Sequence, residues 1–267
     1  MTEHLPFLAA TSLTRLPSSD AGVQRFAATT QPVPWPKAYG GDLLGQAAAA
    51  AFETVGADRP MHAMHSLFVA PANVGEAVEY EVRTLRDGRS YSTREVNGFQ
   101  SGGLVVSSLL SFHVGEESAT HASVLPDVAA PEGLPTAAAG IAVADTVVVP
   151  EVSAAYWSSE GIGGRSFDIR HVEGPLYASP IADTGGVSHV WIKPFVALPD
   201  DDAVHRLALI YVCDYTILEP ALRVEGRAWT DPGLVTASLD HSIWVHEDAR
   251  IDDWVLYTQT LDSYAHG

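Results

Sequence analysis

Two polar side chains interrupt apolar stretches in the second half of the chain, at positions where chemistry is a reasonable expectation. Asp214 directly follows the apolar run 207–213, where a carboxylate is unfavourable unless it is hydrogen-bonded or lies at a cleft. Ser238 precedes the sequence LDHS at 239–242. This segment is predicted to be a strand that packs on the helix formed by the apolar run before Asp214. A carboxylate in such surroundings is a candidate for acid–base chemistry. The alternative is that Asp214 caps a helix turn and Ser238 is an ordinary strand residue.

Other common chemistries find little support. The sequence has no G-x-S-x-G, H-E-x-x-H or G-x-x-x-x-G-K-[ST] motif. The glycine-rich stretch 161–166 lacks the third glycine of a dinucleotide loop and is interpreted as linker. Cys213 lies in an apolar run, which favours core packing over a nucleophilic role. The 11 histidines have no metal-ligand spacing, so we expect neither a metal nor another cofactor.

One stretch of this acidic chain is locally basic. Arg83, Arg86, Arg89 and Arg94 fall within twelve residues whose only acid is Asp87. Such a cluster is typical of solvated hairpin ends. It is also the best candidate in the sequence for contacting phosphate groups.

The composition of the 267 residues restricts the classes of function. A hydrophobic fraction of 46% with 18% charged residues is ample for a buried core. The net charge of −18 argues against a nucleic-acid surface. No run reaches the roughly 18 apolar residues of a membrane span, and the N-terminus has no signal-peptide pattern. A single cysteine is typical of a reducing compartment, so we expect a cytoplasmic protein.

The first part of the chain predicts one helix laid on a bent antiparallel sheet. The Ala-rich segment 42–55 follows Gly40 and Gly41 and is predicted to be a buried helix, with Asp42 as N-cap or first-turn acid. Alternating apolar patterns predict the strands that follow it, at 62–69, 77–85, 90–100 and 103–114.

The later parts differ in character. The stretch 115–164 is rich in Ala, Pro, Ser and Gly and is interpreted as a connection, with one short element at 141–150. Beyond it the pattern predicts a strand around 190–195 and a helix at 201–212, with 214–224 continuing that helix or its neighbour. Two further strands are predicted at 234–245 and 254–261.

An internal repeat relates the two halves. The sequence HSLFV at 65–69 aligns with HSIWV at 241–245, an offset of 176 residues. The same offset places 77–82 over 253–258, which favours duplication. Because the first copy runs on to Val114, the second lacks 23 residues of the pattern, about two strands. We therefore expect the second copy to be truncated.

The ordered motifs resemble the type II acyl-CoA thioesterases. In the first half these are YGGDLLGQA (39–47), HSLF (65–68) and TLRDGRSY (84–91). In the second half they are LPDD (198–201), CDY (213–215) and ASLDHSIW (237–244). The resemblance implies an α+β double hot-dog fold, in which each sheet wraps a central helix. We expect one hot-dog domain at 1–115, a linker at 116–165 and a truncated second domain at 166–267.

The resemblance also implies a reaction, the hydrolysis of fatty acyl-CoA to a free acid and coenzyme A. The family's catalytic group is an Asp, a Thr or Ser, and a late-strand Gln that together activate water. Asp214 and Ser238 match the first two, whereas the Gln would lie beyond Gly267. Asp42 is a second, weaker catalytic candidate, because many relatives carry Gln there and single hot-dog thioesterases carry an acid.

The same resemblance suggests residues for substrate binding. These are Gly40, Gly41, His65, Arg86 and Arg89, with the arginines on the coenzyme A phosphates. A backbone N–H at a helix start would polarise the thioester carbonyl. The expected partner is acyl-CoA, and the expected assembly is a homodimer or homotetramer.

Two other functions remain open. A non-catalytic acyl-CoA-binding or assembly protein of the same fold would lack the catalytic Gln. Hydration of an enoyl thioester would need a His/Asp pair on one helix, which the sequence does not show.

Overall fold

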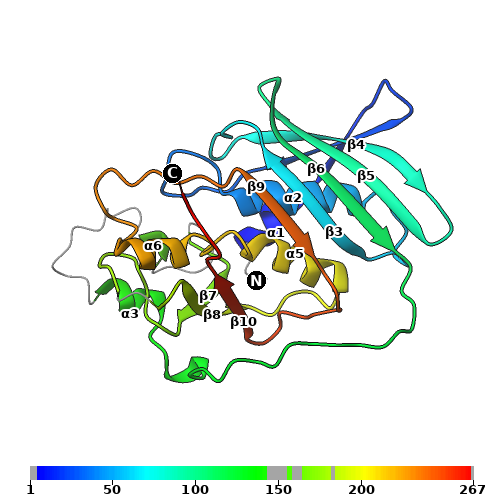
Figure 1. The fold of residues 1–267 in the computed structure, drawn as a ribbon. Coiled ribbons are helices and arrows are strands. Elements are labelled where there is room, and N and C mark those ends of the chain that lie inside the picture. The colour runs from blue at the N-terminus through cyan, green and yellow to red at the C-terminus, as the bar shows by residue number, and fades with distance from the viewer. Residues whose placement is uncertain (1–4, 143–154, 158–163, 182–183, 266–267) are drawn as a thin grey trace.

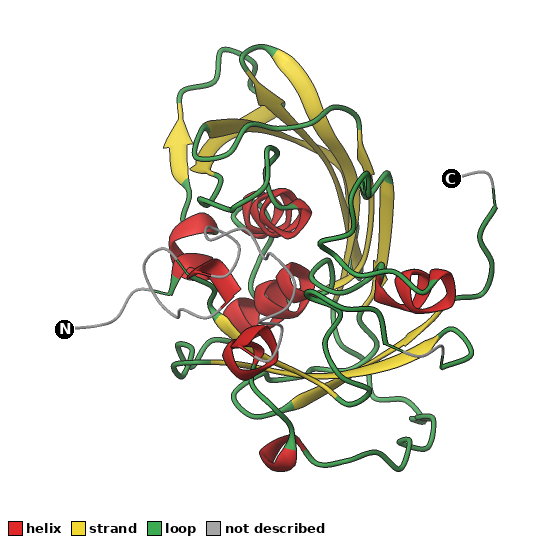
Figure 2. Ribbon diagram, turned by 90° about the vertical axis from the view of Figure 1, so that its left-hand side faces the viewer, coloured by secondary structure: helices red, strands yellow, loops and turns green. Residues whose placement is uncertain are grey.

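A curved antiparallel sheet of seven strands wraps around a central helix in the computed structural model (Figures 1 and 2). The structure describes residues 5–142, 155–157, 164–181 and 184–265. The strand order is β1-β2-β4-β5-β6-β3-β9. The strands are β1 (Thr14–Leu16), β2 (Val23–Thr29), β3 (Met61–Phe68), β4 (Ala77–Asp87), β5 (Tyr91–Gln100), β6 (Gly103–His113) and β9 (Asp240–Trp244).

The central helix is α2 (Gly40–Phe52), and the prediction of a buried helix is confirmed. Every residue from Gly41 to Ala51 is buried, which suits a run of small side chains enclosed by a sheet. The helix begins two residues before the predicted start. A Cβ on Gly41 would lie 2.3 Å from the backbone oxygen of Tyr211, so only glycine permits this close approach.

Two short helical elements and one longer helix complete the layers around α2. The short helix α1 (Pro6–Ala10) packs Phe7 into the core. The helix α5 (Asp202–Val212) packs against α2, and Asp201 caps it by accepting a hydrogen bond from the N–H of Ala203. The short helix α6 (Glu219–Glu225) follows α5.

The second sheet has three strands in the order β10-β8-β7, all antiparallel. They are β7 (Phe167–His171), β8 (Val187–Pro194) and β10 (Val255–Thr260). Between the sheets in sequence lie a 3-10 turn η1 (Pro131–Gly133) and α3 (Ala137–Ala142). Most of the predicted element at 141–150, and the first half of the glycine-rich stretch 161–166, lie outside the described residues.

The predictions for the second half hold in part. Of the two alternatives for 214–224, the neighbouring helix is the correct one for its later part, since α5 ends at Val212 and α6 begins at Glu219. The predicted strand 234–245 is paired only from Asp240 to Trp244. Ser238 therefore lies in an irregular segment before β9, not in a strand, and Leu239 beside it is 71% exposed.

The pairing of β3 with β9 joins the two halves. His65 pairs with Ser242 and Ser66 pairs with His241, so each residue faces the repeat-equivalent of its neighbour. Such exchanged pairing is the mark of a two-fold relation. It supports the duplication predicted from the sequence. Because β9 lies in the seven-stranded sheet, the boundaries at residues 115 and 166 stay a prediction.

The two copies share their strand neighbours. In the first copy β2 pairs with β4, and in the second β8 pairs with β10. In the first copy β5 and β6 lie between β4 and β3. The corresponding strands β10 and β9 are each the last strand of a separate sheet in the described part of the chain.

Candidate functional site

The structure brings Asp214 and Ser238 together. Asp214 lies in the turn after α5, and Ser238 lies two residues before β9. The Ser238 hydroxyl donates a hydrogen bond to Asp214 Oδ1 over 2.7 Å. Both residues are half-buried, so the pair is held by the protein while part of its surface meets solvent.

The pair lies at the first turn of α2. A Cβ on Gly40 would be 2.4 Å from Asp214 Oδ2, so any larger residue would displace the carboxylate. The backbone N–H groups of Gly41 and Gly40 hydrogen-bond this carboxylate. A helix N-terminus also carries partial positive charge, which favours an anion there. The two glycines come from the first half of the chain and the carboxylate from the second.

Burial raises the pKa of Asp214 from 3.8 to about 6. The hydrogen bond from Ser238, the N–H groups of Gly41 and Gly40, and the nearby charge of Lys37 all act in the opposite direction. At neutral pH the carboxylate is therefore mostly ionised, and its pKa is close enough to neutrality for general-base catalysis.

Cys213 is not poised for chemistry. Burial and the neighbouring Asp214 charge raise the pKa of its thiol well above the ordinary value. The thiol donates to the backbone oxygen of Ile210 over 2.8 Å. A protonated, hydrogen-bonded thiol is a poor nucleophile.

Asp42 is fully buried in the first turn of α2, but it does not cap the helix. The N-cap residue is Tyr39, which makes no capping hydrogen bond through its side chain. Asp42 Oδ2 and Oδ1 instead accept from the backbone N–H and side-chain Nε2 of Gln31, over 2.7 and 2.8 Å. The Tyr211 hydroxyl adds a third hydrogen bond. Burial raises the pKa of Asp42 to about 6.

His65 does not lie with Asp214. Its side chain is exposed on the outer surface of the sheet, where Nδ1 lies 3.0 Å from the hydroxyl of Ser242. The buried neighbours Met64 and Ser66 face the other way, as strand alternation requires.

The arginine cluster lies at the far end of α2. Arg94 is buried and donates to the backbone oxygen of Thr54, just after the helix, and to Asp87. Arg59 donates to the backbone oxygens of Gly88 and Arg89 in the β4–β5 hairpin. These two arginines fix the hairpin to the helix end. At a rise of about 1.5 Å per residue, that end is about 18 Å from Gly40.

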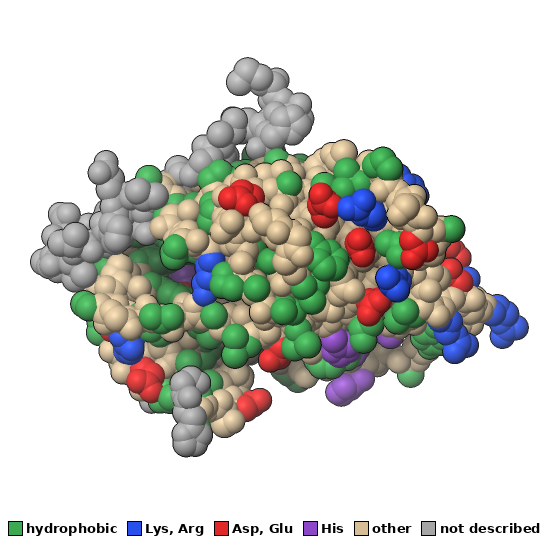
Figure 3. Space-filling model, turned by 90° about the horizontal axis from the view of Figure 1, so that it is seen from above, with side chains coloured by type: hydrophobic (Ala, Val, Ile, Leu, Met, Phe, Trp, Pro, Cys, Tyr) green, Lys and Arg blue, Asp and Glu red, His purple; other side chains and the backbone are tan. Residues whose placement is uncertain are grey.

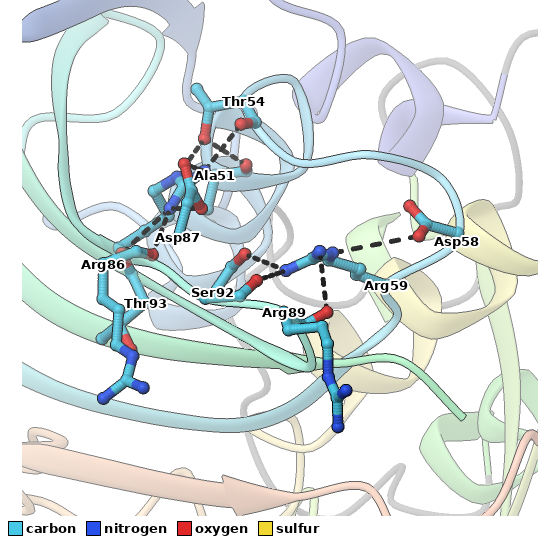
Figure 4. Close-up of polar contacts among 11 residues, drawn as sticks. Ala51, Thr54, Asp58, Arg59, Arg86, Asp87, Arg89, Ser92 and Thr93 are labelled. Carbon is cyan, nitrogen blue, oxygen red and sulfur yellow. Dashed lines mark hydrogen bonds and ion pairs between the residues drawn. The ribbon is translucent and has the colours of Figure 1, made fainter. Parts of the chain in front are cut away.

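Arg86 and Arg89 are exposed, and their guanidinium groups point away from this network (Figure 4). Figure 3 shows Lys and Arg side chains protruding at the end of the molecule that carries the hairpin. A cavity of about 230 Å³ lies beside them, lined in part by Thr54, Arg59 and Arg94. The cavity is therefore at the opposite end of α2 from Asp214.

Sequence reasoning missed two residues that shape these sites. Gln31 donates two hydrogen bonds to Asp42, and no local pattern indicates it, since the two are 11 positions apart. Lys37 lies near Asp214 and binds the backbone oxygen of Thr236. Its place three residues before Gly40 is the only signal the sequence offers.

No late-strand glutamine reaches the pair within the described residues. Gln259 on β10 is buried, accepts from Ser188 and donates to Thr216. Over the same residues no group of three or more His, Cys, Asp or Glu side chains could hold a metal ion. None of the helices described there is long and apolar enough to cross a membrane.

Comparison with known proteins identifies both halves. Residues 31–113 match the family described as acyl-CoA thioesterase N-terminal domain, and residues 181–267 match acyl-CoA thioesterase. Acyl-CoA thioesterase 2 of Haemophilus influenzae is 27% identical over 87% of this chain and 79% of its own length. Human acyl-coenzyme A thioesterase 8 is 28% identical over 84% of this chain and 70% of its own.

Solved structures agree with the fold. The acyl-CoA thioesterase II TesB2 of Mycobacterium marinum is 26% identical in sequence, with a TM-score of 0.70. The match covers 98% of this chain and 86% of the TesB2 chain. A hot-dog protein of Alicyclobacillus acidocaldarius, at 20% identity, has a TM-score of 0.71 over 98% of this chain and 88% of its own. The predicted α+β double hot-dog fold is confirmed. From its two matched halves and its fold, the chain belongs to the acyl-CoA thioesterase family.

Proposed function

We propose that this protein hydrolyses fatty acyl-CoA thioesters to a free acid and coenzyme A, with Asp214 and Ser238 acting on the attacking water. The observation that carries the proposal is the 2.7 Å hydrogen bond between them at the start of α2, in a chain of the acyl-CoA thioesterase family. The Ser238 hydroxyl donates its hydrogen bond to Asp214 Oδ1, so the lone pairs of its oxygen can accept a hydrogen bond from water.

The proposed chemistry follows from those acceptors. Water donates one proton to the Ser238 oxygen and the other to the Asp214 carboxylate, which leaves a lone pair directed at the thioester carbonyl. As the C–O bond forms, Asp214 takes the proton. The positive end of the α2 dipole stabilises the oxyanion. When the C–S bond breaks, protonated Asp214 returns the proton to the sulfur, giving the acid and free thiol.

Substrate binding completes the proposal. Gly40 and Gly41 permit the close approach of helix and carboxylate. Arg86 and Arg89 are offered as contacts for the coenzyme A phosphates, because they are exposed and make no ion pair within the described residues. His65, on the outer surface, has no geometric support for this role.

The decisive test is steady-state hydrolysis of a panel of acyl-CoA esters, with release of free thiol as the readout. We expect turnover in the wild type and its near-complete loss in Asp214→Ala. Asp127→Ala, at an exposed position, is the matched control. Full turnover in Asp214→Ala would reject the assignment of that residue. Tight acyl-CoA binding without turnover in the wild type would point to the non-catalytic alternative.

Assembly and location belong to the same proposal. Leu67, Leu109 and Trp244 are 48–60% exposed on the outer surface of the large sheet, which supports a homodimer or homotetramer. Light scattering of the purified protein tests this, and a monomeric mass would contradict it. A cytoplasmic location is supported by the single cysteine.

A further inference from the structure

Ser238 lies in an irregular segment, so something other than a strand ladder must fix its position. Two backbone contacts flank it. The oxygen of Leu239 accepts from the N–H of Phe68, at the end of β3, over 2.9 Å. The oxygen of Thr236 accepts from the ammonium group of Lys37. The segment is thus held on both sides of Ser238 by residues of the first half.

Lys37 is half-buried and lies three residues before Gly40, in the segment that leads into α2. Its ammonium group is also close enough to Asp214 to act on that carboxylate electrostatically. The other groups that act on Asp214 or are influenced by it are Ser238, the N–H groups of Gly40 and Gly41, Tyr39, Cys213 and Tyr257. Lys37 is the one cation among them in the described residues.

We propose that Lys37 is a positioning residue for the hydrolysis: its bond to Thr236 holds Ser238 against Asp214. Its charge acts on the same carboxylate as a second effect. This inference rests on the proposed function. The first effect acts on the geometry of the water site, and the second acts on the fraction of enzyme in the basic form. Each has its own kinetic signature.

Lys37→Met keeps the length of the side chain and removes both donor and charge. We expect kcat to fall about tenfold or more, as for loss of a charge-assisted hydrogen bond, with little change in KM. The acid limb of the kcat/KM profile should move to higher pH, because the pKa of Asp214 rises when the nearby cation is removed.

Two conservative variants separate the effects. Lys37→Arg retains both donor and charge and should restore kcat and the acid limb. Lys37→Gln retains a donor without charge and should recover part of kcat while the acid limb stays shifted. Thermal unfolding of each variant shows whether the fold is kept.

A double-mutant cycle with Ser238→Ala gives the sharpest outcome. If Lys37 acts through Ser238, Lys37→Met should cost much less in the Ser238→Ala background than in the wild type. Additive losses, an unchanged Lys37→Met, or a loss confined to KM would each overturn the proposal. These outcomes are distinct from failure of the proposed function, in which the wild type itself releases no thiol or Asp214→Ala retains full turnover.

Discussion

Asp42 and Asp214 lie at the same end of α2, and burial raises the pKa of both carboxyl groups to about 6. Their surroundings nevertheless differ. Asp42 is fully buried, and donors from Gln31 and Tyr211 occupy its oxygens. Asp214 is half-buried, and the serine that donates a hydrogen bond to it, Ser238, is half-buried as well.

The difference shows that a raised pKa does not by itself identify a catalytic acid or base. A base must also have a path for its proton and room for the molecule that gives it. Asp214 is partly exposed to solvent, whereas Asp42 is fully buried among the residues that bind it. Asp42 is accordingly interpreted as a buried polar link between α2 and the segment that precedes it.

The largest expected effect separates the two carboxylates by rate. Asp214→Asn removes the base and should lower kcat by about 10²- to 10⁴-fold. Asp42→Asn should leave kcat per folded molecule close to that of the wild type. The necessary control is circular dichroism, which measures how much of each variant is folded without relying on its activity. Equal losses in the two variants would place Asp42 in the catalytic group.

The second prediction concerns the pH dependence of stability. A carboxyl whose pKa is raised on folding stabilises the fold at low pH, and that stability is lost as pH rises from about 4 through about 6. For Asp42 the loss is up to about 3 kcal/mol. The difference in unfolding free energy between wild type and Asp42→Asn should therefore shift in favour of the variant between pH 4 and 7.

Urea unfolding at several pH values measures that difference. Asp214→Asn is the matched comparison and should show a shift of similar size in the same direction, because the pKa of Asp214 is also raised to about 6. A pH-independent difference for Asp42→Asn would mean that Asp42 is not ionised at a raised pKa.

The third prediction concerns the serine that distinguishes Asp214 from Asp42. Ser238→Ala should lower kcat about tenfold, the scale of one hydrogen bond to a charged group. Ser238→Thr keeps the hydroxyl and should retain most of the rate. An alanine variant with wild-type kcat would mean that Ser238 does not touch the water.

The smallest expected effect lies at the opposite end of α2. Reversing the charge of both Arg86 and Arg89 should raise KM about fivefold at low salt, as expected for exposed charges, with kcat unchanged. Arg15→Glu, on β1, is the control for general charge effects. A KM that is unchanged at every ionic strength would remove these arginines from the substrate site.

The sequence predicted the central helix and the four strands that follow it, and it singled out Asp214 and Ser238 without indicating that they lie at the start of that helix. Asp214 could be singled out from the sequence because it breaks an apolar run, which is a local signal. The strand β2 was missed because Gln24 and Arg25 obscure its alternation. The face of the sheet on which His65 lies depends on the irregular register between Met61 and Ala63. The sequence gives no sign of that irregularity.

The misplaced strand at Ser238 has a physical cause. Val235 and Leu239 supply the apolar pattern, but they are 91% and 71% exposed, so the pattern does not correspond to burial. Of the two roles predicted for Asp42, the first-turn acid is confirmed and the N-cap is not, because its donors come from Gln31, in a different segment. Such contacts between distant residues are set by tertiary packing.

The pairing of β3 with β9 has a consequence for folding kinetics. It joins His65 to Ser242, 177 positions apart, and the contact of Asp214 with Gly40 likewise joins the two halves of the chain. Long-range contacts of this kind form late, because the entropy of loop closure must be overcome first. Hydrolytic activity should therefore return only with the last tertiary phase of refolding, after the helix signal of α2 has recovered.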